Sequence, residues 1–179
     1  MHRVRKAETG DGKRIAEIQV GGWQSAYRGI IPDDYLNALN PEKRVTFWSQ
    51  QADNESSDLF VTILGATVTG FCHLIPSRDD DGTGVAEIAA IYVDPCAWRQ
   101  GCGRQLCEAA FEAARRRGAS SVTLWVLEAN LLGRSFYEAI GFRTDGSTKS
   151  EERPGFLLEE VRYRIDPSKR EQDVTGDGH

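Results

Sequence analysis

Two glycines in the stretch AWRQGCGRQL (97–106) lie one residue apart, directly before a run with helical periodicity. Glycine costs about 1 kcal/mol relative to alanine inside a helix or strand. Either the pair lies outside the helix, or another group comes very near the backbone. The first turn of a helix has free N–H groups and a partial positive charge, which together favour an anion. The bend therefore indicates a phosphate site, and the alternative is a turn that only packs a helix against a strand.

Other ligand motifs fail on specific residues. Leu106 stands where a dinucleotide-binding fingerprint needs a third Gly or Ala, and a Walker A loop needs a Gly-Lys-Ser/Thr run that is absent. If Gly82 is the glycine of a calcium loop, Ile88 occupies the closing position that requires Glu. The four cysteines form no Cys-x-x-Cys pair, and no histidine stands near them in ligand spacing. We expect reduced thiols and no metal.

Length and composition are typical of one folded domain. The chain has 179 residues, of which 40% are hydrophobic and 27% charged. We expect a domain over residues 1–165 and a polar tail over 166–179. No stretch approaches the ~18 apolar residues of a membrane span, and the polar start lacks a signal-peptide core, so we expect a cytoplasmic protein. The net charge of −5 disfavours nonspecific binding to nucleic acid or acidic membranes.

The hydrophobic pattern predicts an α/β fold, with a mixed sheet and helices on both of its faces. The expected strands are 4–7, 59–64, 65–76, 84–93, 122–127 and 157–165, of which the last alternates apolar and charged residues as an edge strand would. The expected helices are 15–26, a helix that starts at Pro32, then 41–51, 104–118 and 130–141.

Two of these segments resemble the signatures of the GNAT superfamily of N-acetyltransferases. IYVDPCAWRQGCGRQL (91–106) is similar to its acetyl-CoA motif, and NLLGRSFYEAIGF (130–142) is similar to its second motif. The resemblance extends from about residue 3 to 165, and Trp98 departs from it because Arg or Gln is usual there. It implies a mixed, mostly antiparallel sheet with a splayed central strand pair.

The resemblance also implies where acetyl-CoA binds. The pyrophosphate would lie on the main-chain N–H groups of the bend, at Arg99, Gln100, Gly101, Cys102, Gly103 and Arg104. The pantetheine would lie beside Ile91, Tyr92 and Val93, with the main chains of Ile91 and Val93 pairing with its amides. Asn130 matches a CoA-contacting position, and it is also suited to be a plain helix N-cap.

Two side chains acquire catalytic roles from the same resemblance. Tyr137 matches the tyrosine that protonates the departing sulfur, and a phenol with a pKa near 10 keeps its proton at neutral pH. A buried core tyrosine is the alternative. Glu87 stands six residues before Val93, where several members carry a catalytic base that works through water; the alternative is a solvated strand glutamate. The N–H of Ile91 would meet the oxyanion.

The acceptor would enter beside the segment GWQSAYRGIIPDDYL (22–36). Trp23, Tyr27 and Tyr35 would form an aromatic wall, and Asp33 or Asp34 would meet a cation. Each is also suited to core packing or capping. The expected activity is direct acetyl transfer to a primary amine of a small molecule. Acetylation of protein N-termini, a CoA-binding module without catalysis and a nucleotide-binding protein are the alternatives. Homodimers are common among relatives, but the sequence does not decide this.

Overall fold

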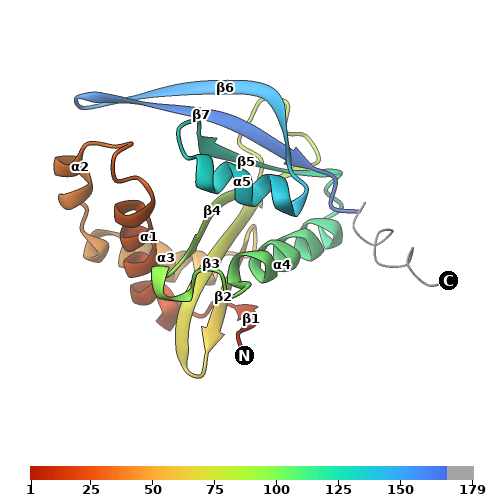
Figure 1. Cartoon of the computed structure of the whole chain (residues 1–179). Coiled ribbons are helices and arrows are strands. Elements are labelled where there is room, and N and C mark those ends of the chain that lie inside the picture. The colour runs from red at the N-terminus through yellow and green to blue at the C-terminus, as the bar shows by residue number, and fades with distance from the viewer. Residues whose placement is uncertain (169–179) are drawn as a thin grey trace.

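The computed structural model describes residues 1–168, so residues 169–179 of the expected tail lie outside the described residues. One sheet runs through the molecule in the order β1-β2-β3-β4-β5-β7-β6 (Figure 1). Its strands are β1 (Arg3–Lys6), β2 (Asp58–Leu64), β3 (Thr67–Pro76), β4 (Val85–Val93), β5 (Ser121–Leu127), β6 (Arg143–Arg153) and β7 (Phe156–Ile165). The helices are α1 (Gly12–Ala26), α2 (Asp33–Asn37), α3 (Val45–Ala52), α4 (Cys102–Arg116) and α5 (Leu131–Ile140), with short 3-10 turns at Thr9–Asp11, Pro41–Arg44 and Pro95–Ala97.

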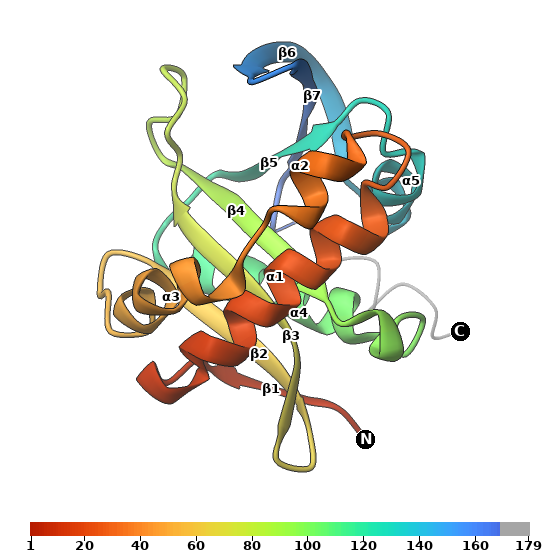
Figure 2. The ribbon, with the colours of Figure 1, turned by 90° about the vertical axis from the view of Figure 1, so that its left-hand side faces the viewer.

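The helices cover both faces of the sheet, as the sequence predicts (Figures 1 and 2). Successive strand residues point to opposite faces. Val61 and Phe71 therefore belong to the buried cluster under α1 and α3, which includes Trp48. Their neighbours Phe60 and Cys72 belong to the cluster under α4. Alternation along two central strands thus builds two cores.

The sheet opens at its centre. β4 and β5 are parallel, but they pair only from Val85–Glu87 to Ser121–Thr123. All other neighbouring strands are antiparallel. The predicted splayed central pair and the mostly antiparallel mixed sheet are confirmed.

The C-terminal strands correct one prediction. The strand expected at 157–165 is β7, but it lies between β5 and β6 and is not an edge strand. The edge is β6, whose polar sequence RTDGSTKSEER has almost entirely exposed side chains and was not predicted as a strand. Because neither of its faces is buried, β6 has no hydrophobic alternation, and only pairing with β7 reveals it.

Helix α4 resolves the question of the two glycines. Gly101 is its N-cap, in the left-handed region with φ 82°, whereas Gly103 lies in the first turn. The helix ends before Gly118, which also has positive φ. Cys107 is buried on its inner face, and the four cysteines, which all lie within residues 1–168, are reduced.

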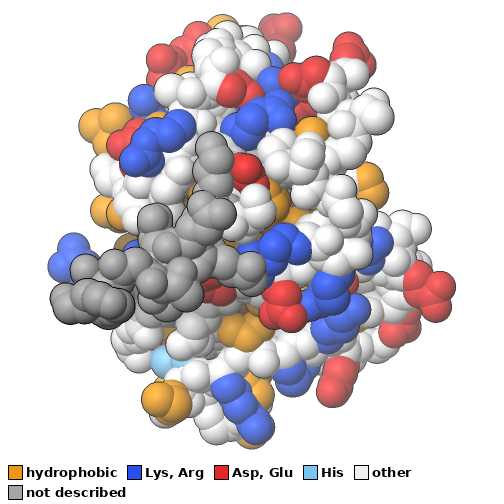
Figure 3. Space-filling view, turned by 90° about the vertical axis from the view of Figure 1, so that its right-hand side faces the viewer, with side chains coloured by type: hydrophobic (Ala, Val, Ile, Leu, Met, Phe, Trp, Pro, Cys, Tyr) orange, Lys and Arg blue, Asp and Glu red, His pale blue; other side chains and the backbone are white. Residues whose placement is uncertain are grey.

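Charged side chains of both signs lie on the surface, and many of them form ion pairs. Asp58, for example, is buried between Lys6 and Arg117, at 3.1 and 2.6 Å. Figure 3 shows Lys and Arg side chains interspersed with Asp and Glu side chains on one side of the molecule. Within residues 1–168, no helix is both long and apolar enough to cross a bilayer.

Candidate active site

An extra residue in β4 changes which face its side chains occupy. Leu74 of β3 pairs with Ile88 and the preceding His73 pairs with Ala90, so Ala89 is unpaired and forms a bulge. Before the bulge, Ile88 packs in the α4 core; after it, Ile91 does, three residues later. The bulge lies where β4 leaves β5.

Beyond the bulge, β4 presents main-chain polar groups to the opening. The N–H of Asp94 donates to the carbonyl of Thr69 at 2.8 Å, which makes these two residues a hydrogen-bonded antiparallel pair. Pairs alternate along an antiparallel ladder, so Ile91 and Val93 direct their N–H and C=O groups away from β3 and toward the opening. This edge has the geometry to pair with an extended amide chain.

Trp98, the residue that departs from the family pattern, occupies one hydrogen-bond acceptor of this edge. Its indole N–H donates to the carbonyl of Val93 at 2.7 Å. The N–H and C=O of Ile91 and the N–H of Val93 therefore remain for a ligand. The departure does not disturb the bend that follows.

The bend before α4 has main-chain geometry that suits an anion. Arg99 and Gly101 both have positive φ, at 59° and 82°. The N–H groups of residues 99–104 donate to no acceptor in residues 1–168, and the first helical bond runs from Gln105 to Gly101. Six adjacent free donors at a helix N-terminus favour a bound anion such as phosphate. Gln100 holds the loop in place, because its side chain bonds the Cys96 carbonyl and the His2 ring.

A cavity of about 150 Å³ lies where β4 and β5 diverge. It brings together six of the residues that the sequence singled out: Trp23, Tyr27, Ile91, Tyr92, Asn130 and Tyr137. Trp125 and Glu160 also line it, and sequence reasoning missed both. A signal for Glu160 existed, since it shares a β7 face with the buried Leu158.

Tyr137 enters the cavity from α5. Its ring packs edge-on against Phe136 and Phe142, with centroids 5.3 and 5.9 Å away. Burial raises the pKa of the phenol well above its usual value near 10. Its hydroxyl makes no hydrogen bond with any group in residues 1–168, so it is a protonated donor available to a ligand. Asn130 caps the same helix by accepting from the N–H of Gly133 at 3.0 Å, and it also lines the cavity.

Three aromatic residues form the wall of the cavity on the α1 side. The Trp23 indole donates to the Tyr92 hydroxyl at 2.7 Å, and the Tyr27 hydroxyl lies 3.3 Å from it. Burial raises the pKa of Tyr27 well above 10, and it also raises the pKa of Tyr92. These phenols stay neutral at neutral pH, so they act as a wall and not as bases.

Other predicted site residues lie outside the residues that line this cavity. Glu87 is 1% exposed and precedes the bulge; its carboxylate accepts from the Arg78 guanidinium at 2.5 Å and from the Arg78 N–H at 3.1 Å. Asp33 is exposed and pairs with Arg28 at 3.3 Å. Tyr35 packs edge-on against Phe156 of β7. The acidic side chain that lines the cavity is therefore Glu160 and not Glu87.

Residues 23–142 match the family model described as the acetyltransferase (GNAT) family. The chain belongs to the GNAT acetyltransferase family. As a GNAT member it is an acyltransferase that uses acetyl-CoA. An uncharacterized N-acetyltransferase of Bacillus subtilis is 34% identical over 73% of this chain and 74% of its own length.

The chain is also similar to an N-acetyltransferase sequence and to an N-acetyltransferase structure from Thermoplasma acidophilum. A spermidine N(1)-acetyltransferase is 28% identical over 80% of this chain and 91% of its own length. A PaiA N-acetyltransferase, solved in complex with coenzyme A, has a TM-score of 0.73 and 21% identity, and the match covers 93% of this chain and 99% of that one. This last likeness establishes a shared fold.

Proposed function

We propose that the protein transfers the acetyl group of acetyl-CoA directly to a primary amine of a small molecule, within a ternary complex. One observation carries this proposal: a protonated phenol, a free main-chain edge, an aromatic wall and a single carboxylate surround one small cavity. The phenol and the edge suit a thioester. The wall and the carboxylate suit a cationic amine.

Acetyl-CoA fits the groups that the chain leaves free. The diphosphate would accept hydrogen bonds from the N–H groups of residues 99–104, which have no other acceptor in residues 1–168. The pantetheine amides would pair with Ile91 and Val93, whose polar groups point away from β3. Asn130 would contact the same chain from the start of α5. These positions align the thioester with the cavity.

Each step of the transfer has a group to serve it. The amine nitrogen attacks the thioester carbonyl carbon, so a C–N bond forms and the C–S bond breaks. The N–H of Ile91 would donate to the carbonyl oxygen as negative charge develops on it. Tyr137 would give its proton to the departing sulfur, and its raised pKa keeps that proton on the phenol at neutral pH until the C–S bond breaks. The nitrogen loses a proton to water, and water returns one to the Tyr137 phenolate, so the products are the N-acetylamine and the free CoA thiol.

The acceptor class is supported by charge and by one relative. Glu160 is the only carboxylate among the residues that line the cavity, and five of the other lining residues are aromatic. The name of the Thermoplasma acidophilum relative states that it acts on spermidine, a small cationic amine. A cavity of about 150 Å³ suits such a molecule better than a folded protein substrate.

The test is release of free CoA thiol from acetyl-CoA in the presence of polyamines, monoamines, amino acids, aminoglycosides and short peptides. We expect release with small amines, and the mass of the product should increase by one acetyl group. Turnover only with peptides would replace the small-molecule acceptor by a protein N-terminus. Acetyl-CoA binding without turnover on any acceptor would overturn the enzymatic proposal. Competition by ATP at equal concentration would point to a nucleotide site.

A further inference from the structure

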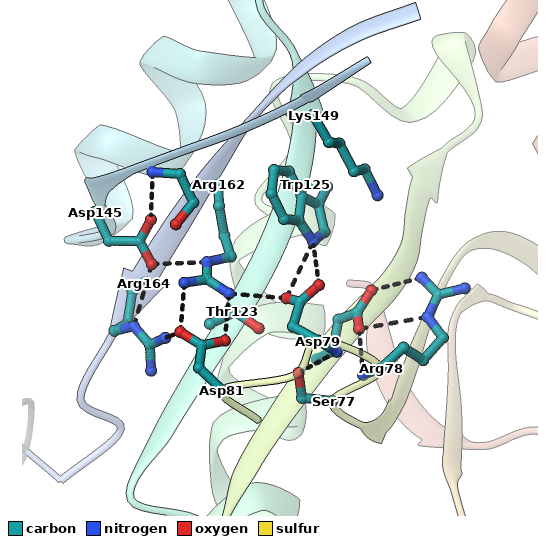
Figure 4. Close-up of polar contacts among 12 residues, drawn as sticks. Ser77, Arg78, Asp79, Asp81, Thr123, Trp125, Asp145, Lys149, Arg162 and Arg164 are labelled. Atoms are coloured by element: carbon teal, nitrogen blue, oxygen red, sulfur yellow. Dashed lines mark hydrogen bonds and ion pairs between the residues drawn. The ribbon is translucent and has the colours of Figure 1, made fainter. Parts of the chain in front are cut away.

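An ammonium group of the protein already occupies a site at the edge of the cavity. The Nζ of Lys149 lies 3.3 Å from Oε2 of Glu160 and 4.4 Å from the centroid of the Trp125 ring. The three residues come from β6, β7 and β5. Figure 4 shows Lys149 reaching toward the Trp125 ring. A carboxylate together with an aromatic face is a recognised arrangement for binding an ammonium ion.

Glu160 and Trp125 line the cavity, whereas Lys149 does not. The side chain of Glu160 is 19% exposed and that of Lys149 is 41% exposed. The carboxylate is thus shared between a partly exposed lysine on one side and the cavity on the other. A cation that arrived through the cavity would meet the same carboxylate and the same ring.

The neighbouring arginine does not compete for Glu160. Arg162 also lies near the Trp125 ring, but its guanidinium binds carboxylates of Asp79, Asp81 and Asp145 at 2.7 to 3.0 Å (Figure 4). Lys149 is the only ion-pair partner of Glu160 within residues 1–168. Removing or displacing Lys149 therefore leaves this carboxylate without an ion-pair partner among residues 1–168.

The ion pair between Lys149 and Glu160 is of a kind that is easily exchanged. The two residues lie directly opposite each other on β6 and β7, and β6 is the exposed edge of the sheet. Ion pairs with a solvent-exposed lysine are weak and are screened by salt. Lys149 can rotate into solvent without breaking a strand hydrogen bond, because only its side chain must move.

We propose that Glu160 and Trp125, here called the cation subsite, bind a second ammonium group of the acceptor, and that Lys149 is the resident competitor for this subsite. The acceptors favoured by this arrangement are aliphatic diamines and polyamines, in which one amine is acetylated while another stays charged. This inference rests on the proposed function, and it adds the substrate class and the residues that select it.

The test compares a diamine and a monoamine of equal chain length, 1,4-diaminobutane and butylamine, as acceptors. Glu160→Gln keeps the side-chain volume and removes the charge; we expect about a tenfold or larger rise in KM for the diamine, as for other lost charge-assisted contacts. KM for butylamine should rise by a clearly smaller factor than KM for the diamine, since butylamine has no second ammonium that could lose this contact. Lys149→Met should lower the diamine KM and leave the butylamine KM unchanged.

Glu159→Gln is the matched control, because it removes the same charge from an exposed neighbouring position on β7. Equal changes for both amines in Glu160→Gln, or no diamine effect of Lys149→Met, would overturn the cation subsite while leaving the acetyltransferase activity intact. If neither amine is acetylated, binding replaces turnover as the test of the cation subsite. Calorimetry then measures the Kd of 1,4-diaminobutane for the wild type, Glu160→Gln and Lys149→Met. We expect Glu160→Gln to raise this Kd and Lys149→Met to lower it, and the absence of both changes would overturn the inference.

Discussion

The ring of Phe136 lies against the backbone of Gly103, so that a Cβ placed on this glycine would be 2.8 Å from the Cζ of the ring. The contact joins the first turn of α4, beside the bend at residues 99–104, to the helix that carries Tyr137. The Phe136 and Tyr137 rings are themselves 5.3 Å apart. Gly103, in the first turn of α4, therefore makes room for an aromatic ring of α5.

Gly103→Ala should reveal this contact. Alanine gains about 1 kcal/mol of helix propensity, but crowding against the ring costs about 1–3 kcal/mol. We expect a small net loss of stability in Gly103→Ala and its recovery when Phe136→Leu is added. A double-mutant cycle from urea unfolding should show a coupling of about 1 kcal/mol. Additive effects of the two changes would mean that the ring moves away without cost.

Gly101→Ala should weaken acetyl-CoA binding by distorting the bend. Its φ of 82° is unfavourable for alanine, although nothing lies within 4 Å of the new methyl group, and the strain costs about 1–2 kcal/mol. Gly118→Ala is the control, since Gly118 ends the same helix with φ 75° and equally open space. Both variants should lose similar stability in denaturant unfolding, but only Gly101→Ala should raise the KM for acetyl-CoA. A similar KM in both would argue against the bend as the phosphate site.

Tyr137→Phe should slow turnover without loosening the cofactor. Removing a general acid costs about a hundredfold or more in kcat, while the phenyl ring keeps its packing against Phe142. Steady-state kinetics should show a low kcat and an acetyl-CoA KM within about twofold of the wild type. Wild-type kcat in this variant would assign Tyr137 to packing alone.

Glu87→Gln distinguishes the predicted base from a structural role. The carboxylate is buried against Arg78, and Glu87 is not among the residues that line the cavity. We expect about 1–2 kcal/mol of destabilisation from the weakened charged contact, with an unchanged shape of the profile of kcat/KM against pH. Loss of activity mainly at low pH would restore Glu87 as the base acting through water.

His73 should make the protein sensitive to mild acid. Burial, followed by the nearby charge of Arg78, lowers its pKa from 6.5 to about 4, against a smaller opposing effect of Asp58. The folded state thus favours the neutral ring, so this contribution to stability is complete above pH 6.5 and is lost as the pH falls toward 4. The difference of 6.5 − 4 corresponds to about 3 kcal/mol.

Urea unfolding of the wild type and of His73→Gln across this range measures that contribution. Glutamine can still bond Ser57, which lies 3.1 Å from the His73 ring nitrogen, but it does not titrate. The wild type should therefore lose more stability between pH 6.5 and 4 than the variant does. Parallel curves for the two proteins would refute the assignment.

The amino-acid sequence by itself determined the features that depend on local chemistry. Gly101 and Gly118 mark the two ends of α4 because few other residues adopt their positive φ at low cost. Hydrophobic periodicity located the other helices and six of the seven strands. The family motifs brought Tyr137 and Asn130 into the candidate site, and both line the cavity.

The tertiary structure decided which side chains meet. The bulge at Ala89 changes which side of the sheet the β4 side chains point to. Counting six residues back from Val93 therefore did not predict the surroundings of Glu87. Strand β6 forms only because β7 offers it an edge, and it then brings Lys149 opposite Glu160. Alternation of apolar and polar residues shows that a strand has two faces, but only pairing with strands distant in sequence decides what each face contacts. For this reason the acidic group of the cavity became known only from the fold.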